Sequence, residues 1–339
     1  MDNEIEYSKR LGKLTTEQFQ AALTKFKLGD YIKAESVSSG LFGQNVIISS
    51  TKGKYILRGK PHYPWQFPKE KYGAELLHKY TKVPVPYPYL YEPTTDIFGW
   101  SFIIMPFMPG INPTNEKISI NEKINISFAL GKNLADLHQC KWPFPGQYDL
   151  FTGTIKQFDD SYNGWFIKEI EQRLARISEN CGISENEVFW VREYLNKNIS
   201  ALLDNFQPCF VMNDYNPGNV VVKKVNGEWI ISGLFDLMEY YFGDGDADLV
   251  RLIAIFLDNY KNIALDLIKA FIEGYFSKEI MGSKIIEKYK LFMLRDRLIV
   301  WEYGIRPDVA WFNKESSFFD YVKKYIDNND IYNIFMKRL

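Results

Sequence analysis

The stretch Cys209–Lys224, CFVMNDYNPGNVVVKK, limits the possible folds of this 339-residue chain more than any other segment. An apolar, β-like run stands on each side of a polar centre, which is typical of two buried strands joined by a loop. Pro217 and Gly218 exclude helical geometry from that centre. The loop holds Asp214 and Asn219, and such residues are also common in ordinary turns. A plain turn is therefore the first interpretation to test.

The spacing of the polar residues argues for more than a turn. Asp214 and Asn219 are five residues apart, as in the D-x-x-x-x-N catalytic loop of kinases. Asp236 follows about seventeen residues later, at the end of an apolar run in LFDL. Phosphoryl transfer with magnesium requires such a set: one carboxylate orients and deprotonates the attacking hydroxyl, and an amide and a second carboxylate hold the cation.

The rest of the chain changes character along its length. A β-rich first third, with two helices, precedes a mostly helical remainder, in which Cys209–Lys224 and Glu228–Leu237 are β-like islands. This order predicts an α+β fold of two lobes with a cleft between them. The elements expected from periodicity and breakers are helices over Thr15–Phe26, Lys69–Tyr80, Asn121–Gln139, Tyr162–Ser178 and Glu185–Asp204, and strands over Tyr31–Val37, Val46–Ser50, Lys54–Arg58, Tyr87–Tyr91 and Trp100–Met105.

A glycine- and serine-rich segment, SVSSGLFGQNVIIS, lies between the first two of these strands. Residues without a bulky side chain let backbone N–H groups approach phosphates closely. A lone glycine pair would indicate an ordinary hairpin turn, but a basic strand follows. The residues expected to contact the nucleotide in this loop are Ser38, Ser39, Gly40 and Gly43.

The basic strand ends in KYILRGK. Arg58 and Lys60 are two residues apart, so both are expected to project to the same side of the strand. Arg58 is the preferred phosphate contact and Lys60 the alternative. Glu70 and Glu75 on the following helix are both candidates for an acidic partner, and surface charge is the competing interpretation.

The two motifs NDYNPGNVVV and GLFDLMEYYFGDGDADL together resemble the aminoglycoside phosphotransferase and choline kinase family. The resemblance runs from about Ser38 to Arg251. It implies a bilobal protein-kinase-like fold, with a nucleotide-binding lobe over residues 1–106 and a helical lobe over residues 107–339. It also implies that Asp214 is catalytic and that Asn219 and Asp236 are metal ligands.

Three further positions follow from the resemblance. Asp248 corresponds to an aspartate that braces the catalytic loop, and Met212 stands where the family usually has histidine. The segment SFIIMPFMPG resembles the hinge where adenine bonds to the backbone. If Gly110 is aligned with the glycine of the family's hinge, the carbonyl of Pro106 is the acceptor for adenine and the N–H of Met108 is the donor. Proline is tolerated at position 106 because it keeps its carbonyl.

The acceptor is expected to be a small molecule with a hydroxyl group. Cationic acceptors such as aminoglycosides require acidic walls, and an aromatic run around Trp301, Tyr303 and Trp311 is suited either to a quaternary ammonium or to a packed core. The candidate acids for the acceptor site are Glu239, Glu302, Asp159 and Asp160. An aminoglycoside-type amino sugar, and hence a role in antibiotic resistance, is the preferred acceptor class, with choline or ethanolamine as the alternative.

Composition excludes several other classes of protein. With 41 Lys plus Arg against 42 Asp plus Glu, the net charge of −1 gives no basic field for nucleic acid. The three cysteines form no CxxC pair, which argues against a zinc site or a disulfide framework. The sequence predicts no signal peptide and no membrane span. We therefore expect a cytoplasmic enzyme, a monomer or weak homodimer.

The sequence as a whole predicts a small-molecule kinase that uses ATP (or GTP) and Mg²⁺. Two other classes stay open: a nucleotide-binding protein of the same fold that has lost transfer, and an unrelated helical scaffold whose loops are only turns. Stabilisation by nucleotide separates the scaffold from the two kinase-fold alternatives.

Overall fold

The computed structural model describes residues 4–37, 43–180, 182–203, 205–312 and 316–338. Its contacts divide the chain into two compact units, and each unit combines segments that are distant in sequence. Unit 1 consists of Met1–Asn115, Tyr148–Thr154 and Pro217–Glu239; unit 2 consists of Glu116–Gln147, Ile155–Asn216 and Tyr240–Leu339. The sequence predicts a single division after residue 106, whereas contacts also join the hairpin after the D-x-x-x-x-N loop to unit 1.

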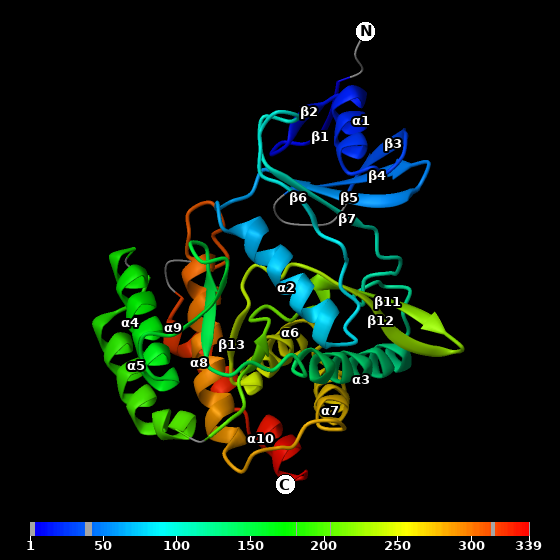
Figure 1. Ribbon diagram of the computed structural model, residues 1–339. Helices are drawn as coiled ribbons and strands as arrows, with labels where there is room; N and C mark the ends of the chain where they lie inside the picture. Colours follow the sequence, from blue (N-terminus) through cyan, green and yellow to red (C-terminus); the bar gives the residue numbers. More distant parts are fainter. Residues whose placement is uncertain (1–3, 38–42, 181, 204, 313–315, 339) are drawn as a thin grey trace. The chain divides into compact units, whose positions relative to one another are not determined.

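Unit 1 is built on a five-stranded antiparallel sheet with the strand order β3-β4-β5-β7-β6 (Figure 1). Strand β5 is central, so Arg58 is flanked by Asn45 on one side and Ile103 on the other. The strands of this sheet are β3 (Tyr31–Ser36), β4 (Asn45–Ser50), β5 (Gly53–Gly59), β6 (Leu90–Glu92) and β7 (Phe102–Pro106).

Apolar side chains of the sheet and of helix α1 form the core of unit 1. Phe19 on α1 and Leu57 and Phe102 on the sheet have exposed fractions of 1% or less, and α1 contacts β3. A capping box of Thr15 and Gln18 begins α1. The other elements of unit 1 are β1 (Ile5–Ser8), β2 (Gly12–Leu14), α1 (Thr16–Lys25), α2 (Gln66–Tyr80), β11 (Val220–Val225) and β12 (Glu228–Leu234).

Unit 2 is mostly helical and carries a small sheet with the order β10-β13-β8-β9. Long helices α3, α4, α5 and α8 make up much of it, and α8 contacts both α4 and α5 (Figure 1). Its helices are α3 (Ile120–Leu137), α4 (Tyr162–Glu179), α5 (Glu185–Asn198), α6 (Leu249–Asn259), α7 (Ala264–Tyr275), α8 (Ile285–Gly304), α9 (Phe318–Ile326) and α10 (Asn329–Met336). The strands of the small sheet are β8 (Gly146–Asp149), β9 (Thr154–Gln157), β10 (Cys209–Val211) and β13 (Tyr241–Gly243). The segment Tyr148–Thr154, which includes the end of β8 and the start of β9, is counted with unit 1.

Helices α3 and α7 pack together through two glycines. A Cβ at Gly131 would lie 2.1 Å from the carbonyl oxygen of Phe271, and a Cβ at Gly274 would lie 2.1 Å from that of Phe128. Both approaches are to backbone, which cannot move aside as a flexible side chain can. The two helices are therefore held closer together than any residue with a side chain would permit.

Gly131→Ala should lower the free energy of unfolding by about 1–3 kcal/mol, because overpacking forces the two backbones apart. Gly282→Ala is the matched control, since a Cβ at exposed Gly282 would meet nothing within 4 Å. Urea unfolding of both variants measures the difference. Equal midpoints for the two variants would show that the α3–α7 contact tolerates a methyl group.

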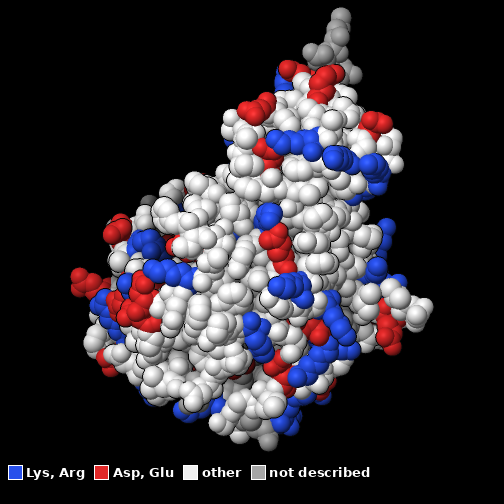
Figure 2. All heavy atoms as spheres, viewed as in Figure 1, with Lys and Arg blue, Asp and Glu red and all other residues white. Residues whose placement is uncertain are grey.

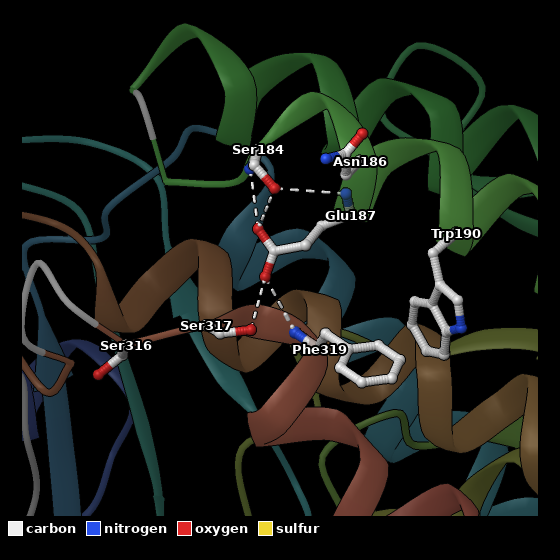
Figure 3. A pocket seen from close by; sticks show the side chains of 7 residues that line it. All are labelled: Ser184, Asn186, Glu187, Trp190, Ser316, Ser317 and Phe319. Atoms are coloured by element: carbon white, nitrogen blue, oxygen red, sulfur yellow. Dashed lines mark hydrogen bonds between the residues drawn. The ribbon is translucent and has the colours of Figure 1, made fainter.

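Glu187 joins the beginnings of α5 and α9 beside a shallow surface hollow (Figure 3). Its carboxylate accepts hydrogen bonds from the backbone and hydroxyl of Ser184 at 2.9 and 2.7 Å, from Ser317 Oγ at 2.8 Å and from Phe319 N at 3.1 Å. These bonds lower the pKa of Glu187 despite its burial. The carboxylate therefore acts as a shared cap for two helices, and we assign it a structural role.

The face seen in Figure 2 carries both signs of charge, with Lys and Arg side chains interspersed among Asp and Glu. Cys140 and Cys209 are buried and free, and Cys181 lies outside the described residues. Among the described helices, none is both long enough and apolar enough for a membrane span.

Candidate active site

Arg58 lies at the centre of a charged cluster in unit 1. Its Nη2 is 3.2 Å from Glu70 Oε1 on α2 and 3.3 Å from Asp236 Oδ1 in the segment after β12. The side chains of Arg58 and Glu70 are 7% and 0% exposed, whereas that of Asp236 is 27% exposed. One guanidinium thus connects a buried glutamate with an aspartate that solvent and ligands can reach.

Burial and charge act against each other in this cluster. Burial raises the pKa of the Glu70 carboxyl, and the Arg58 guanidinium opposes that rise. Burial alone would lower the pKa of Arg58, but Glu70 and Asp236 outweigh burial and raise it. Arg58 therefore keeps its charge, and the two acids position it from either side.

Asp236 and Asn219 are connected through the backbone. The N–H of Phe235 donates to the carbonyl of Asn219 at 2.8 Å, so the residue next to Asp236 is bonded to Asn219 itself. Asp236 has a φ of 61°, in the left-handed region that few residues other than glycine adopt. Such strain concentrates at functional sites, where the surroundings hold it in place. The structure thus brings together two residues that the sequence pairs as metal ligands.

The structure decides two questions that the sequence left open: whether Lys60 lies beside Arg58, and which glutamate pairs with Arg58. Strand β5 ends at Gly59, and Lys60 has a φ of 53° and an exposed side chain whose amine donates to the carbonyl of Arg10. The spacing predicts that Lys60 continues the strand on the same side as Arg58. The structure shows that it does not, because the strand ends before Lys60. Glu75 is paired with Lys71 on the surface, so Glu70 is the partner of Arg58.

The rest of the expected nucleotide site is partly described. Ser38, Ser39 and Gly40 lie outside the described residues. Gly43 has a φ of 58°, and its carbonyl accepts a hydrogen bond from Ser8 Oγ at 2.5 Å.

At the expected hinge, the strand β7 ends at Pro106 and the next N–H, of Phe107, donates to Lys54 O at 3.0 Å. Among the described residues, the structure gives the N–H of Met108 no acceptor. This group is therefore free to donate to a ligand.

The D-x-x-x-x-N loop begins in unit 2, where Asp248 holds it. The two carboxylate oxygens of Asp248 accept hydrogen bonds from Met212 N and Asn213 N, both at 2.7 Å. His138 Nε2 lies 3.2 Å from the same carboxylate. Asn213, directly before Asp214, has a φ of 66°. The Met212 side chain is fully buried. Because Asp248 accepts from the backbone N–H groups of Met212 and Asn213, the loop is braced although histidine is absent from position 212.

Tyr215 anchors the other side of Asp214. Its ring is fully buried, and its hydroxyl lies 3.0 Å from both Leu130 O and Asn133 Oδ1 on α3. Asp214 itself remains 39% exposed. A carboxylate held between two fixed neighbours, yet open to solvent, is suited to receive a proton from a bound hydroxyl group.

Two arginines that the sequence interpretation missed stand beside this loop. Arg251 Nε on α6 lies 3.5 Å from Asp214 Oδ1, and Arg295 Nη1 on α8 donates to Asn213 Oδ1 at 2.7 Å. A signal for Arg295 was present: the charged triplet Arg295-Asp296-Arg297 interrupts the apolar stretch LFMLRDRLIVW. Arg251 stands two residues after the end of the family-like tail motif and gives no comparable signal.

A family model describes the same region of the chain. The model of the phosphotransferase enzyme family, abbreviated APH, matches residues 33–281. The chain belongs to the phosphotransferase enzyme family. The match spans the glycine-rich segment, Arg58, the D-x-x-x-x-N loop and Asp236, and it makes the protein an enzyme of the small-molecule kinase class.

Solved structures of other phosphotransferases share the fold. A proposed fructosamine-3-kinase from Thermobifida fusca has a TM-score of 0.62 at 14% identity, covering 94% of this chain and 98% of that one. The choline kinase LicA from Streptococcus pneumoniae has a TM-score of 0.57 at 15% identity, covering 94% and 99%.

Spectinomycin phosphotransferase, solved with ADP and spectinomycin, has a TM-score of 0.54 at 18% identity, covering 94% of this chain and 96% of that one. No curated protein matches the sequence. At these identities the likeness establishes the protein-kinase-like fold, with a β-rich unit and a helical unit.

For this phosphotransferase, the acids expected at the acceptor differ in their surroundings. Glu302 is bound by Arg173 at 2.7 Å and by Arg176 at 2.6 Å, and these partners lower its pKa against the effect of burial. Asp159 is 83% exposed and pairs with Lys156. Asp160 and Glu239 are also exposed. The charge of Glu302 is therefore already neutralised by this chain's own arginines.

The aromatic residues expected near the acceptor also differ in their exposure. Trp301 is 2% exposed, packs against Phe312 and Tyr321, and donates from its indole N–H to Gly182 O at 2.7 Å. Trp301 therefore belongs to the packed core. Trp311 is 56% exposed, and the centre of its ring lies 5.1 Å from the centre of the Tyr303 ring.

Proposed function

We propose that this phosphotransferase transfers the γ-phosphate of ATP, with Mg²⁺, to a hydroxyl group of a small molecule. The observation that carries the proposal is the Arg58 cluster: a buried Glu70 holds a guanidinium beside Asp236, whose neighbour is bonded to Asn219. A guanidinium in this position suits phosphate oxygens through paired N–H donors. GTP is the alternative donor.

The donor set of Asp236 and Asn219 fits magnesium. Both residues offer hard oxygen ligands, and Mg²⁺ in kinases is bound through one or two protein groups together with phosphate oxygens. The described residues contain no group of three or more His, Cys, Asp or Glu arranged to hold a metal by themselves. When bound, the ion would neutralise charge on the phosphates during transfer.

Asp214 is the proposed general base. Its carboxylate takes the proton of the acceptor hydroxyl as the acceptor oxygen forms its bond to the γ-phosphorus and the bond from that phosphorus to the oxygen of ADP breaks. The products are a phosphorylated acceptor and ADP. The bracing of Met212 and Asn213 by Asp248 supports an active loop and weighs against the transfer-inactive alternative.

The proposed acceptor is a small molecule with a hydroxyl group. An aminoglycoside-type amino sugar is the class that the sequence favours, and choline or ethanolamine is its alternative. The neutralised Glu302 and the buried Trp301 support neither cation, so Glu239, Asp159 and Asp160 remain the proposed acidic contacts for a cationic acceptor.

The test of the proposed function is magnesium-dependent formation of ADP from ATP by the purified full-length protein. We expect ADP formation to rise in the presence of a hydroxyl acceptor and to stop with EDTA. Absence of both MgATP binding and ADP formation would reject the proposal.

Arg58→Ala should raise the KM for ATP by more than about tenfold, because charge-assisted bonds to phosphate are lost. Lys60→Ala, which removes an exposed amine bonded to Arg10 O, should change this KM less than about twofold. Steady-state kinetics at varied ATP measures both. A larger effect for Lys60→Ala would show that Lys60 is the phosphate contact.

Folding of the Arg58 variant needs its own control. Removing Arg58 leaves Glu70 buried without its cation, which typically costs about 3–5 kcal/mol. Arg58→Ala combined with Glu70→Gln removes that buried charge. The double variant should regain stability in urea unfolding while the raised KM for ATP persists.

A further inference from the structure

Arg295 is a buried guanidinium with unused hydrogen-bond donors. Its side chain is 7% exposed and lies over the rings of Trp165 and Tyr241. Nε donates to Glu169 Oε2 at 2.6 Å, and Nη1 donates to Asn213 Oδ1 at 2.7 Å. The structure gives its other terminal nitrogen, Nη2, no acceptor among the described residues. No nitrogen of Arg295 is among the buried atoms that lack a partner, so Nη2 is reached by solvent. A fixed guanidinium with an accessible donor next to Asn213 is suited to bind a ligand.

Arg251, on α6, also has open donors, and it lies beside Asp214. Its Nε lies 2.9 Å from Asp296 Oδ1 and 3.5 Å from Asp214 Oδ1, and its side chain is 15% exposed. Neither terminal nitrogen has a hydrogen bond to a described residue, and Nε itself lacks one of acceptable geometry. The guanidinium is thus positioned beside the proposed base by charge, while its donors stay available.

The acids around these two arginines are already committed. Arg297 shares the Asp296 carboxylate with Arg251, and the two arginines lower the pKa of Asp296 although burial alone would raise it. Glu169 is shared by Arg295 and Arg173. Arg173 also binds Glu302, and Arg297 also contacts Asp258. These acids are paired with arginines, while Arg251 and Arg295 keep terminal donors near Asp214 and Asn213.

We infer that Arg251 and Arg295 form an acceptor subsite that selects hydroxylated small molecules carrying a carboxylate or phosphate group. The anionic group would bind the open donors of the two guanidiniums, and a neighbouring hydroxyl would face Asp214. Arg251 and Arg295 then determine specificity, while Asp214 remains the base. The inference rests on the proposed function and names a substrate class opposite in charge to an amino sugar.

The charge of the site favours this class over cations. A cationic acceptor brought to Asp214 would stand beside Arg251, and like charges at close range repel. The same two arginines offer a second use, which is contact with the transferring γ-phosphate. Contact with the γ-phosphate predicts a change in the KM for ATP and no change in the preference among acceptors. Steady-state kinetics therefore distinguish this use from an acceptor subsite.

The test compares paired acceptors that share a polyol skeleton and differ in charge. The pairs are glycerate and glycerol, gluconate and glucose, and ribose 5-phosphate and ribose; kanamycin and choline represent cations. ADP formation from MgATP gives kcat/KM for each acceptor. Comparison of glycerate and gluconate with ribose 5-phosphate shows whether the subsite prefers a carboxylate or a phosphate. We expect at least one anionic member to exceed its neutral counterpart and both cations by about tenfold or more.

Arg251→Gln and Arg295→Gln should abolish that preference, raising the acceptor KM by about tenfold while the KM for ATP stays within about twofold. Arg295→Lys keeps a charge but loses the planar fork, and should retain part of the preference. Arg192→Gln is the matched control, because exposed Arg192 pairs with Glu171 on the surface. It should preserve the preference in full.

Thermal shift of the wild type and Arg295→Gln, with ribose 5-phosphate and with ribose, supplies a readout independent of transfer. Stabilisation by ribose 5-phosphate but not by ribose, lost in Arg295→Gln, supports the subsite even if none of these acceptors is phosphorylated. Equal response to both sugars, or preference for kanamycin or choline in the kinetic assay, overturns the inference and leaves the phosphotransferase assignment intact. A raised KM for ATP with unchanged acceptor preference overturns it in favour of γ-phosphate contact.

Discussion

Asp214→Asn should reduce kcat by about 10²–10⁴-fold with any acceptor that the wild type phosphorylates. Asparagine keeps the size and hydrogen bonding of the side chain but cannot take the proton as a carboxylate does. Loose transition states of phosphoryl transfer place much of the catalytic work on positioning, so the lower end of this range is also consistent with the account. Steady-state kinetics at saturating ATP measures the change.

The fold and the nucleotide site should survive this substitution. Arg251 keeps Asp296 as a partner when Asp214 becomes neutral, and Met212 and Asn213 keep their bonds to Asp248. The KM for ATP should therefore change little. Asp266→Asn, at an exposed position of α7, is the matched control for loss of one carboxylate and should retain full kcat. Wild-type turnover by Asp214→Asn would remove Asp214 from the mechanism.

Asp236→Ala should weaken MgATP binding by about 100-fold or more. Even indirect partners of metal ligands cost about 10–100-fold when removed, and Asp236 is the proposed ligand itself. Calorimetric titration of ATP with and without Mg²⁺ measures the effect, which should fall on the magnesium-dependent part. Arg58 retains Glu70 in this variant, so phosphate contact through the guanidinium persists.

Asp214→Ala provides the comparison for Asp236→Ala. Asp214 is assigned to the acceptor and Asp236 to the ion, so the first variant should bind MgATP nearly as the wild type does. Equal MgATP affinities in the two variants would contradict these separate roles.

Local sequence signals were sufficient for most helices. Ser119 with Glu122 and Ser184 with Glu187 form capping boxes that begin α3 and α5 within one residue of the predicted starts. The central strands of unit 1 were also predicted, because apolar runs between Gly or Ser clusters indicate buried strands. The spacing Asp214, Asn219 and Asp236 likewise depends only on positions along the chain.

Features that depend on distant contacts were not predictable. The short strands β1, β2, β8 and β9 have three or four residues each, too few for a periodicity to emerge. Helix α2 begins at Gln66 rather than Lys69. Which of two glutamates faces Arg58 depended on the packing of that helix against the sheet, and sequence spacing left the choice open.

The arginine pair beside the catalytic loop shows the same limit. Arg295 is 82 residues from Asn213, and no local rule connects them. Charge in an apolar helix indicates that a partner exists but does not identify it. The acceptor acids were proposed from sequence because cationic acceptors need them, whereas the ion pairs of Glu302 appear only when α4 and α8 are packed together.

The central claim is magnesium-dependent transfer from ATP with Asp214 as base. Its most direct test is a time course of ADP formation by the wild type and by Asp214→Asn, with the paired acceptors and with water alone, in Mg²⁺ and in EDTA. The account predicts acceptor-stimulated ADP formation in Mg²⁺ for the wild type, loss of that stimulation in Asp214→Asn, and none in EDTA. ADP formation that is identical in the two proteins, or absent from the wild type under every condition, would contradict it.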